Sequence, residues 1–228
     1  MPAEAPALAL FDIDGTLVRR SGPHHREVLV DAVRRVTGLE TTTDGIPVHG
    51  MLDPDILTAM MQAVGAPRAV IRRAMPEIVT RAQNLYVRRV PDLQEKTCPG
   101  VPEVLEKIRS RGLLLGLVTG NLTRIGWKKL EKAGLKRYFR FGAFGEMAPD
   151  RSGLVRIAVR RARAEGWIGK RAPVAMIGDA PSDVIAAKAN RVKAIAVATG
   201  LSPAEELRGY GPDILLGNLT ELEMGELV

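Results

Sequence analysis

Carboxylate side chains occur in two short motifs whose spacing could hold a divalent cation. Asp12 and Asp14 lie one residue apart in DIDGT, and Asp179 and Asp183 lie in GDAPSD, each motif directly after an apolar run. Carboxylates at such short range repel one another, and each is costly to bury without a partner. If the two motifs converge, a hard cation with oxygen ligands, above all Mg²⁺, would compensate their charge.

Groups suited to bind an anion accompany these acids. The amide of Gly15, the hydroxyl of Thr119 and the helix start that follows Gly120 and Asn121 could each contact a phosphoryl oxygen. A metal ion together with such donors would spread the negative charge of the transition state in phosphoryl transfer. The motifs therefore indicate chemistry on a phosphate ester.

Alternating helix and strand patterns predict the elements that must position these residues. After a first strand that ends at Phe11, short apolar strands are expected at 113–118, 173–178, 192–197 and 213–216, and helices at about 101–111, 122–133, 152–165, 181–189 and 203–208. This alternation predicts an α/β fold, in which helices cover both faces of a Rossmann-like parallel sheet. Ligands of such folds bind beyond the carboxyl ends of the strands, where the polar motifs fall.

Residues 19–97 interrupt this alternation. They show little strand character and carry helical patterns at about 24–37, 53–64 and 67–88. We therefore expect a small inserted α-helical domain over 19–97, with a catalytic core formed by residues 1–18 and 98–228.

Composition indicates the setting in which the protein works. Of its 228 residues 46% are hydrophobic, and the single cysteine, Cys98, excludes an internal disulfide framework. No apolar run reaches the length of a membrane span, and the N-terminus lacks a signal-peptide pattern. These features predict a cytoplasmic protein that does not bind membranes.

The positive net charge of +7 permits several partners. It arises from short basic clusters such as Lys128-Lys129, which are expected on solvated helix faces. Aromatic residues make up only 4%, too few for the stacking surfaces of single-strand binding proteins. We expect no nucleic-acid binding, although a basic nucleic-acid-binding protein stays an alternative that salt-dependent gel shifts would test.

The fragments FDIDGTLV, LVTGN and IGDAPSDV, in this order, resemble the signature motifs of the haloacid dehalogenase superfamily of phosphohydrolases. The resemblance covers nearly the whole chain, and the helical insertion is similar to the cap of the phosphoglycolate phosphatase-like branch. It implies a Mg²⁺-dependent phosphatase that hydrolyses a small phosphomonoester through an aspartyl-phosphate intermediate.

The resemblance also implies the catalytic roles. Asp12 would be the nucleophile, and Asp14 would protonate the leaving oxygen and later deprotonate the attacking water. Thr119 would hold a phosphate oxygen with help from the amide of Asn121.

A metal site is implied by the same resemblance. Mg²⁺ would be held by the carboxylate of Asp12, the backbone carbonyl of Asp14 and the carboxylate of Asp179. Asp183 would contact metal-bound water or orient another ligand.

The chain departs from the family pattern at one position. That pattern calls for a lysine between the second and last motifs, but residues 141–156 contain none. Arg151 occupies the expected place, and we predict that it binds the phosphate and neutralises the nucleophile. A guanidinium is not equivalent to an ammonium, so activity should be poor if Arg151 points elsewhere.

Two residues of the predicted insertion are candidates for further roles. His49 lies in the stretch VHGMLDPDI, which would face the active site in the resembling branch, and it is either a substrate contact or a surface or packing histidine. Asp53 is expected to cap the helix that begins at Pro54.

The sequence leaves several functions open. A phosphomutase or nucleotidase of the same superfamily, or a non-catalytic phosphate-binding protein on the same scaffold, could carry these motifs. The expected partner is a small phosphorylated metabolite, whose identity the motifs do not specify. The oligomeric state is likewise undetermined.

Overall fold

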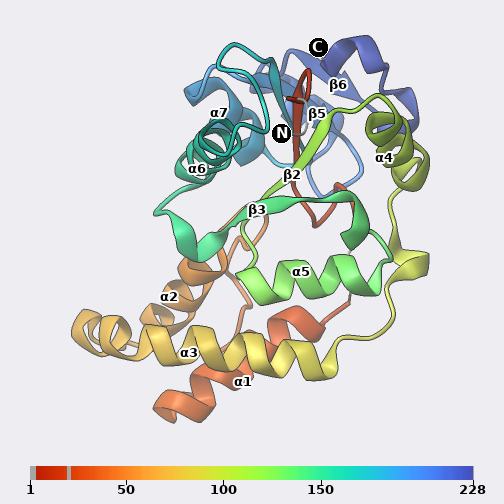
Figure 1. Ribbon diagram of the computed structural model, residues 1–228. Helices are drawn as coiled ribbons and strands as arrows, with labels where there is room; N and C mark the ends of the chain where they lie inside the picture. The colour runs from red at the N-terminus through yellow and green to blue at the C-terminus, as the bar shows by residue number, and fades with distance from the viewer. Residues whose placement is uncertain (1–3, 20–21, 228) are drawn as a thin grey trace.

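A six-stranded parallel sheet forms the centre of the computed structural model, which describes residues 4–19 and 22–227 (Figure 1). The strand order is β3-β2-β1-β4-β5-β6. The strands are β1 (Leu8–Phe11), β2 (Leu114–Thr119), β3 (Phe141–Phe144), β4 (Val174–Gly178), β5 (Lys193–Val197) and β6 (Ile214–Leu216). β1 therefore lies between β2 and β4, so the residues that follow these three strands meet at one edge of the sheet.

Helices cover both faces of the sheet because its strands are apolar on both faces. Leu8 and Leu10 of β1 pack with the side of α6 and α7, whereas Ala9 and Phe11 pack with the side of α4 and α5. The helices of this part are α4 (Val101–Ser110), α5 (Thr123–Lys132), α6 (Arg151–Ala164), α7 (Pro181–Ala189) and α8 (Ala204–Gly209). The predicted α/β class and its parallel sheet are confirmed.

One strand was not predicted from the sequence. β3 is a four-residue edge strand with the sequence FGAF, and its glycine and short length hide the strand pattern. Its close fit to β2 depends on another glycine, because a Cβ on Gly116 would lie 2.7 Å from the ring of Phe141.

Three helices follow β1 and form what we call the insert: α1 (His24–Thr37), α2 (Asp53–Ala63) and α3 (Arg68–Arg89). α1 and α3 pack along each other, and α3 also contacts α5 of the sheet-containing part (Figure 1). No helix in the described part of the chain is long and apolar enough to cross a membrane.

The chain enters and leaves the insert at one place. Val18 forms an antiparallel bridge with Thr97, and the amide of Arg19 donates to the carbonyl oxygen of Lys96 at 2.6 Å. The domain division at residues 18/19 and 97/98 stays a prediction.

A charge cluster joins α1 to α3. The Asp31 carboxylate accepts hydrogen bonds from Arg34 at 2.9 Å and Arg35 at 3.1 Å, and it pairs with Arg89 of α3 at 2.7 Å. Burial raises the pKa of Asp31, but the three guanidinium groups outweigh it and lower this pKa to about 2.

We expect Asp31→Asn to lower the free energy of unfolding by about 1 kcal/mol at neutral pH, because the half-exposed arginines are screened by solvent. Since the pKa is lower in the folded state, the stabilisation is present above the unfolded pKa of about 4 and is lost as the pH falls through about 2. Urea unfolding of the wild type and of Asp31→Asn, from neutral pH down to about pH 2, measures this contribution to the free energy of unfolding. Exposed Asp44 provides the control Asp44→Asn, and equal stability of Asp31→Asn and the wild type at neutral pH would contradict the expectation.

Candidate active site

Three buried carboxylates converge at the carboxyl ends of β1 and β4. Asp12 directly follows β1, Asp179 directly follows β4, and Asp183 lies in the first turn of α7. One oxygen from each of the three lies within 4.8 Å of the others. Their exposed fractions are 5%, 1% and 2%, so solvent does little to screen their repulsion.

The electrostatics of this acid cluster call for a cation. Burial, reinforced by the charges of Asp12 and Asp183, raises the pKa of Asp179 well above its ordinary value. Burial also raises the pKa of Asp183, to about 7, although the nearby Arg151 lowers it. When ionised, the three carboxylates and the single guanidinium beside them carry a net charge of −2.

Two oxygens of the cluster are left for a ligand. Within the described residues, Oδ1 of Asp12 and Oδ2 of Asp179 are buried and have no hydrogen-bond partner. Hard oxygen donors, two oxygens without a hydrogen bond and a charge of −2 fit a divalent cation. The cation would bind between Asp12, Asp179 and Asp183.

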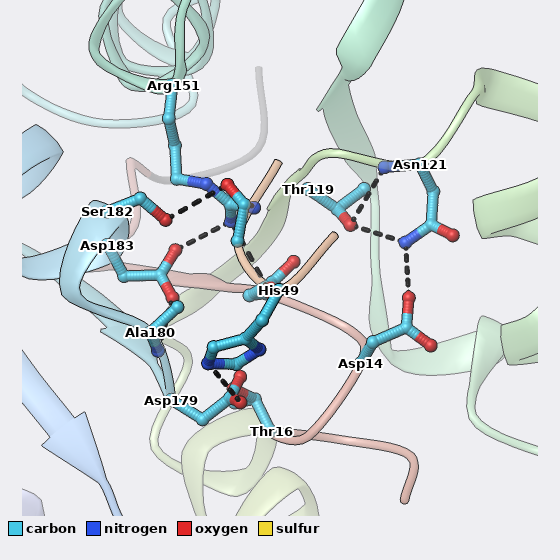
Figure 2. Close-up of polar contacts among 12 residues, drawn as sticks. Asp14, Thr16, His49, Thr119, Asn121, Arg151, Asp179, Ala180, Ser182 and Asp183 are labelled. Atoms are coloured by element: carbon cyan, nitrogen blue, oxygen red, sulfur yellow. Dashed lines mark hydrogen bonds and ion pairs between the residues drawn. The ribbon is translucent and has the colours of Figure 1, made fainter. Parts of the chain in front are cut away.

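Arg151 lies beside the acid cluster (Figure 2). It is the first residue of α6, whose start is fixed by a hydrogen bond from the amide of Gly153 to the Asp150 carboxylate at 2.7 Å. Its Nη1 lies 2.6 Å from Oδ1 of Asp183 and 3.3 Å from Oδ2 of Asp12. Burial alone would lower the pKa of Arg151, but the surrounding carboxylates raise it above its ordinary value. Arg151 thus lies where the sequence predicted a cation, and its catalytic role stays a prediction.

Asp14 faces a different environment, on the opposite side of the site from Asp183 (Figure 2). Nζ of Lys129, a residue of α5, lies 2.7 Å from Oδ1 and 2.6 Å from Oδ2 of Asp14. Nδ2 of Asn121 donates to the same Oδ2 at 2.7 Å. Burial raises the pKa of Asp14, but Lys129, with help from His25 and Asn121, outweighs this effect and lowers it below its ordinary value.

Lys129 corrects one expectation from the sequence. The Lys128-Lys129 cluster was expected on a solvated helix face, but Lys129 is fully buried in the site. The signal was present in its spacing, because Lys129 falls three and four residues from Gly126 and Ile125 on the apolar face of α5. A cation at a core position of an amphipathic helix indicates a buried anionic partner.

The loop after β2 joins these groups. The side chain of Asn121 links Oγ1 of Thr119, at 2.7 Å, to Asp14, and it accepts a hydrogen bond from Lys129 at 2.7 Å. Gly120 permits close approach of the insert, because a Cβ there would lie 2.2 Å from the carbonyl oxygen of Met51. The predicted phosphate contacts of Thr119, Gly120 and Asn121 stay predictions.

Gly15 shapes the acid cluster through its conformation. Its φ is +84°, and an added Cβ would lie 2.2 Å from Oδ2 of Asp179, so only glycine lets that carboxylate approach. Its amide donates to the carbonyl oxygen of Val18 at 2.8 Å. The predicted binding of a phosphate oxygen by this amide would require that bond to break.

Asp53 does not cap its own helix, contrary to the expectation. Leu52 is the N-cap of α2, and no side-chain capping bond is formed there. The Asp53 carboxylate instead accepts a hydrogen bond from the amide of Leu122 at 2.8 Å, at the start of α5, and it lies 3.0 Å from Nε2 of His25. Asp53 therefore joins the insert to the positive end of the α5 dipole.

His49 lies between the acid cluster and the loop that follows β5. Its Nε2 is 3.9 Å from Oδ2 of Asp179 (Figure 2). The same nitrogen is 3.3 Å from Oγ of Ser202. This position brings His49 to the site, while its contact with a substrate stays a prediction.

A cavity of about 440 Å³ opens between the sheet edge and the insert. Its lining includes Asp12, Asp14, Thr119, Lys129 and Arg151 from the sheet side, and His25, Arg26, His49 and Met51 from the insert and its loops. This volume lies in the lower part of the range for small-molecule sites, so the cavity fits a small ligand.

Known proteins are similar to nearly the whole chain. Residues 6–190 match the sequence model of a hydrolase family described as haloacid dehalogenase-like hydrolase. A phosphoglycolate phosphatase of Synechococcus elongatus is 30% identical over 220 residues, with 93% of each chain covered. A phosphoglycolate phosphatase of Nitrosococcus oceani is 26% identical over 234 residues, which cover 96% of this chain and 95% of the relative.

Solved structures share the fold at lower identity. A predicted phosphatase from Clostridium acetobutylicum superimposes with a TM-score of 0.69 at 19% identity and 96% coverage of both chains. A β-phosphoglucomutase from Clostridium difficile superimposes with a TM-score of 0.70 at 15% identity, over 97% of this chain and 94% of that one. At these identities the likeness shows the fold alone.

Because protons and a divalent cation compete for the acid cluster, we expect Mg²⁺ to raise the melting temperature more at about pH 8 than at about pH 5.5. Asp183 has a raised pKa in the folded protein, so its ionisation destabilises the metal-free fold as the pH rises from about 4 to about 7. A bound cation removes that cost. Thermal unfolding with and without Mg²⁺ measures the effect, Asp179→Asn should reduce it, and an equal Mg²⁺ shift at both pH values would contradict it.

Proposed function

The chain belongs to the family of haloacid dehalogenase-like hydrolases, and from this premise we propose that it is a Mg²⁺-dependent phosphatase of a small phosphomonoester. The convergence of Asp12, Asp179 and Asp183 beside Arg151 carries the proposal. The curated relatives named above are phosphoglycolate phosphatases, which makes 2-phosphoglycolate the leading substrate.

In the first step Asp12 acts as the nucleophile. A carboxylate oxygen of Asp12 attacks the phosphorus atom, and the bond from phosphorus to the ester oxygen breaks. Lys129 keeps Asp14 ionised in the free site, so Asp14 first takes up a proton from solvent through its exposed side. It donates this proton to the leaving oxygen, so the alcohol departs neutral and Asp14 becomes a carboxylate again. If Oδ1 of Asp12 holds the cation, Oδ2, which lies 3.3 Å from Nη1 of Arg151, is the oxygen that attacks.

In the second step the aspartyl phosphate is hydrolysed. The Asp14 carboxylate takes a proton from a water molecule, whose oxygen attacks phosphorus. The bond from phosphorus to the Asp12 oxygen breaks, which releases inorganic phosphate and restores both aspartates.

The residues around Asp12 would hold the charges of this reaction. Mg²⁺ would be held by Asp12, Asp179 and the backbone carbonyl of Asp14, with Asp183 close by, and when bound it supplies positive charge beside the phosphoryl oxygens. Arg151 takes the place of the family lysine in this proposal. Its Nε is buried without a hydrogen-bond partner among the described residues, which supports donation to a phosphoryl oxygen.

The insert serves as a cap over this site in the proposed enzyme. It contributes Arg26 to the cavity lining, and His49 belongs to the loop between α1 and α2. Both side chains are suited to contact the acid group of a substrate such as 2-phosphoglycolate, and closure would exclude water. We place the enzyme in the cytoplasm, with a small phosphorylated metabolite as its partner, on the composition of the sequence.

The proposal is tested by phosphate release from 2-phosphoglycolate, nucleoside monophosphates, sugar phosphates and an aryl phosphate, with and without Mg²⁺. We expect Mg²⁺-dependent turnover with 2-phosphoglycolate preferred, and a fall of about 10³-fold or more in Asp12→Asn because its nucleophile is lost. Asp44→Asn is the control for a surface carboxylate and should keep wild-type rates. A folded wild type that releases no phosphate from any ester would favour the non-catalytic phosphate-binding alternative, and a preference for a nucleotide or a mutase reaction would favour those members of the superfamily.

A second prediction concerns the cation that replaces the family lysine. Arg151→Ala should reduce kcat/KM by about 10²-fold or more, because it removes a charge contact to the transition state. Arg151→Lys should recover part of this loss, since it keeps the charge but not the planar fork. Steady-state kinetics on the preferred ester measures both variants, with exposed Arg72→Ala as the control. Normal kinetics in Arg151→Ala would show that the arginine only pairs with Asp183.

A further inference from the structure

One buried lysine in the cavity has no role in the mechanism above. Nζ of Lys129 donates to both oxygens of Asp14, at 2.7 and 2.6 Å, and to Oδ1 of Asn121 at 2.7 Å, and it lies 3.2 Å from Nδ1 of His25. The carboxylate, the amide and the imidazole account for the three protons of the ammonium group. Lys129 therefore has no proton left for a substrate in this arrangement.

The two partners of the Asp14–Lys129 pair differ in exposure. The side chain of Lys129 is 1% exposed, whereas that of Asp14 is 40% exposed and lines the cavity. Burying an ammonium group is costly, and a buried ion pair adds little net stability to a fold. The ammonium group of Lys129, which is costly to bury, donates to both oxygens of Asp14, the residue assigned to proton transfer. This favours a role of Lys129 in the reaction over a role in stability.

We propose that Lys129 is a positioning residue, which fixes the carboxylate of Asp14 beside Asn121 for proton transfer to and from the substrate. The proposal rests on the proposed function. When Asp14 gives its proton to the leaving oxygen it becomes an anion, and the ammonium group beside it holds that anion for the second step. Asn121 links this pair to Thr119 at the predicted phosphate site.

His25 makes the position of Lys129 depend on the insert. An ammonium group only donates hydrogen bonds, so Nδ1 of His25 accepts and Nε2 carries the proton that is donated to Asp53. The Asp53 carboxylate in turn accepts from the amide of Leu122. Lys129 thus completes its set of partners only while α1 and α2 lie against the start of α5.

The test compares Lys129→Met with Lys128→Met. Lys128 is the adjacent residue of the same helix, is 20% exposed and pairs with Glu131, so its variant controls for loss of a charge on α5.

Lys129→Met should lower kcat on the preferred alkyl ester at least about tenfold with little change in KM. The first-turnover burst from 4-nitrophenyl phosphate should fall much less, because that leaving group departs without a proton. Lys129→Gln keeps a hydrogen-bond donor at this position and should recover part of the rate. Such recovery would show that the loss in Lys129→Met does not come from misfolding.

The decisive measurement repeats the substitution in Asp14→Asn. If Lys129 acts through Asp14, Lys129→Met should cause no further loss of kcat in that background. Equal additional losses in both backgrounds, or kcat of Lys129→Met equal to that of Lys128→Met, would overturn the Lys129 proposal while the wild type remained an active phosphatase. A folded wild type that releases no phosphate from any ester would overturn the proposed function and the Lys129 proposal with it.

Discussion

Repulsion among Asp12, Asp179 and Asp183 is the interaction that the other residues of the site, and a bound cation, must compensate. The parallel order of β1 and β4 forces these side chains together at one sheet edge, where burial removes the screening of water. Arg151 offsets part of the charge, and the absence of a side chain on Gly15 gives the Asp179 carboxylate its space. The remaining charge and the two oxygens left for a ligand define what a bound cation must supply.

The two aspartates of the DIDGT motif are separated by one residue but meet opposite electrostatic surroundings. Asp12 belongs to the acid cluster. Asp14 instead accepts hydrogen bonds from the ammonium group of Lys129, which lowers the pKa of Asp14. The lowered pKa suits Asp14 to its proposed second step, in which a carboxylate accepts a proton from water, whereas proton donation in the first step requires Asp14 to be protonated against the pull of Lys129. The turn at the end of β1 separates these environments, and the loop after β2 connects the second of them to Thr119.

Much of this architecture could be predicted from the sequence, because apolar periodicity fixes helices and parallel strands and because strand ends share one edge. Most element ends lie within one or two residues of the prediction. The missing strand, β3, is short and contains a glycine, so its formation depends on the neighbouring β2. Lys129 and Asp53 were misread for a related reason, since their partners are distant in sequence and only the packing of α5 against the insert brings them together. The catalytic and metal-binding roles stay predictions until they are measured.

The bridge between Val18 and Thr97 has a consequence for how such a protein can evolve. Because the chain crosses into and out of the insert at neighbouring backbone positions, the two ends of the sheet-containing part already lie side by side there. A replacement segment of any length whose own termini lie close together can be spliced at that point without changing a strand of the sheet. Such a segment would have to supply new partners for Lys129 and for the amide of Leu122, because His25 and Asp53 of the insert contact them here.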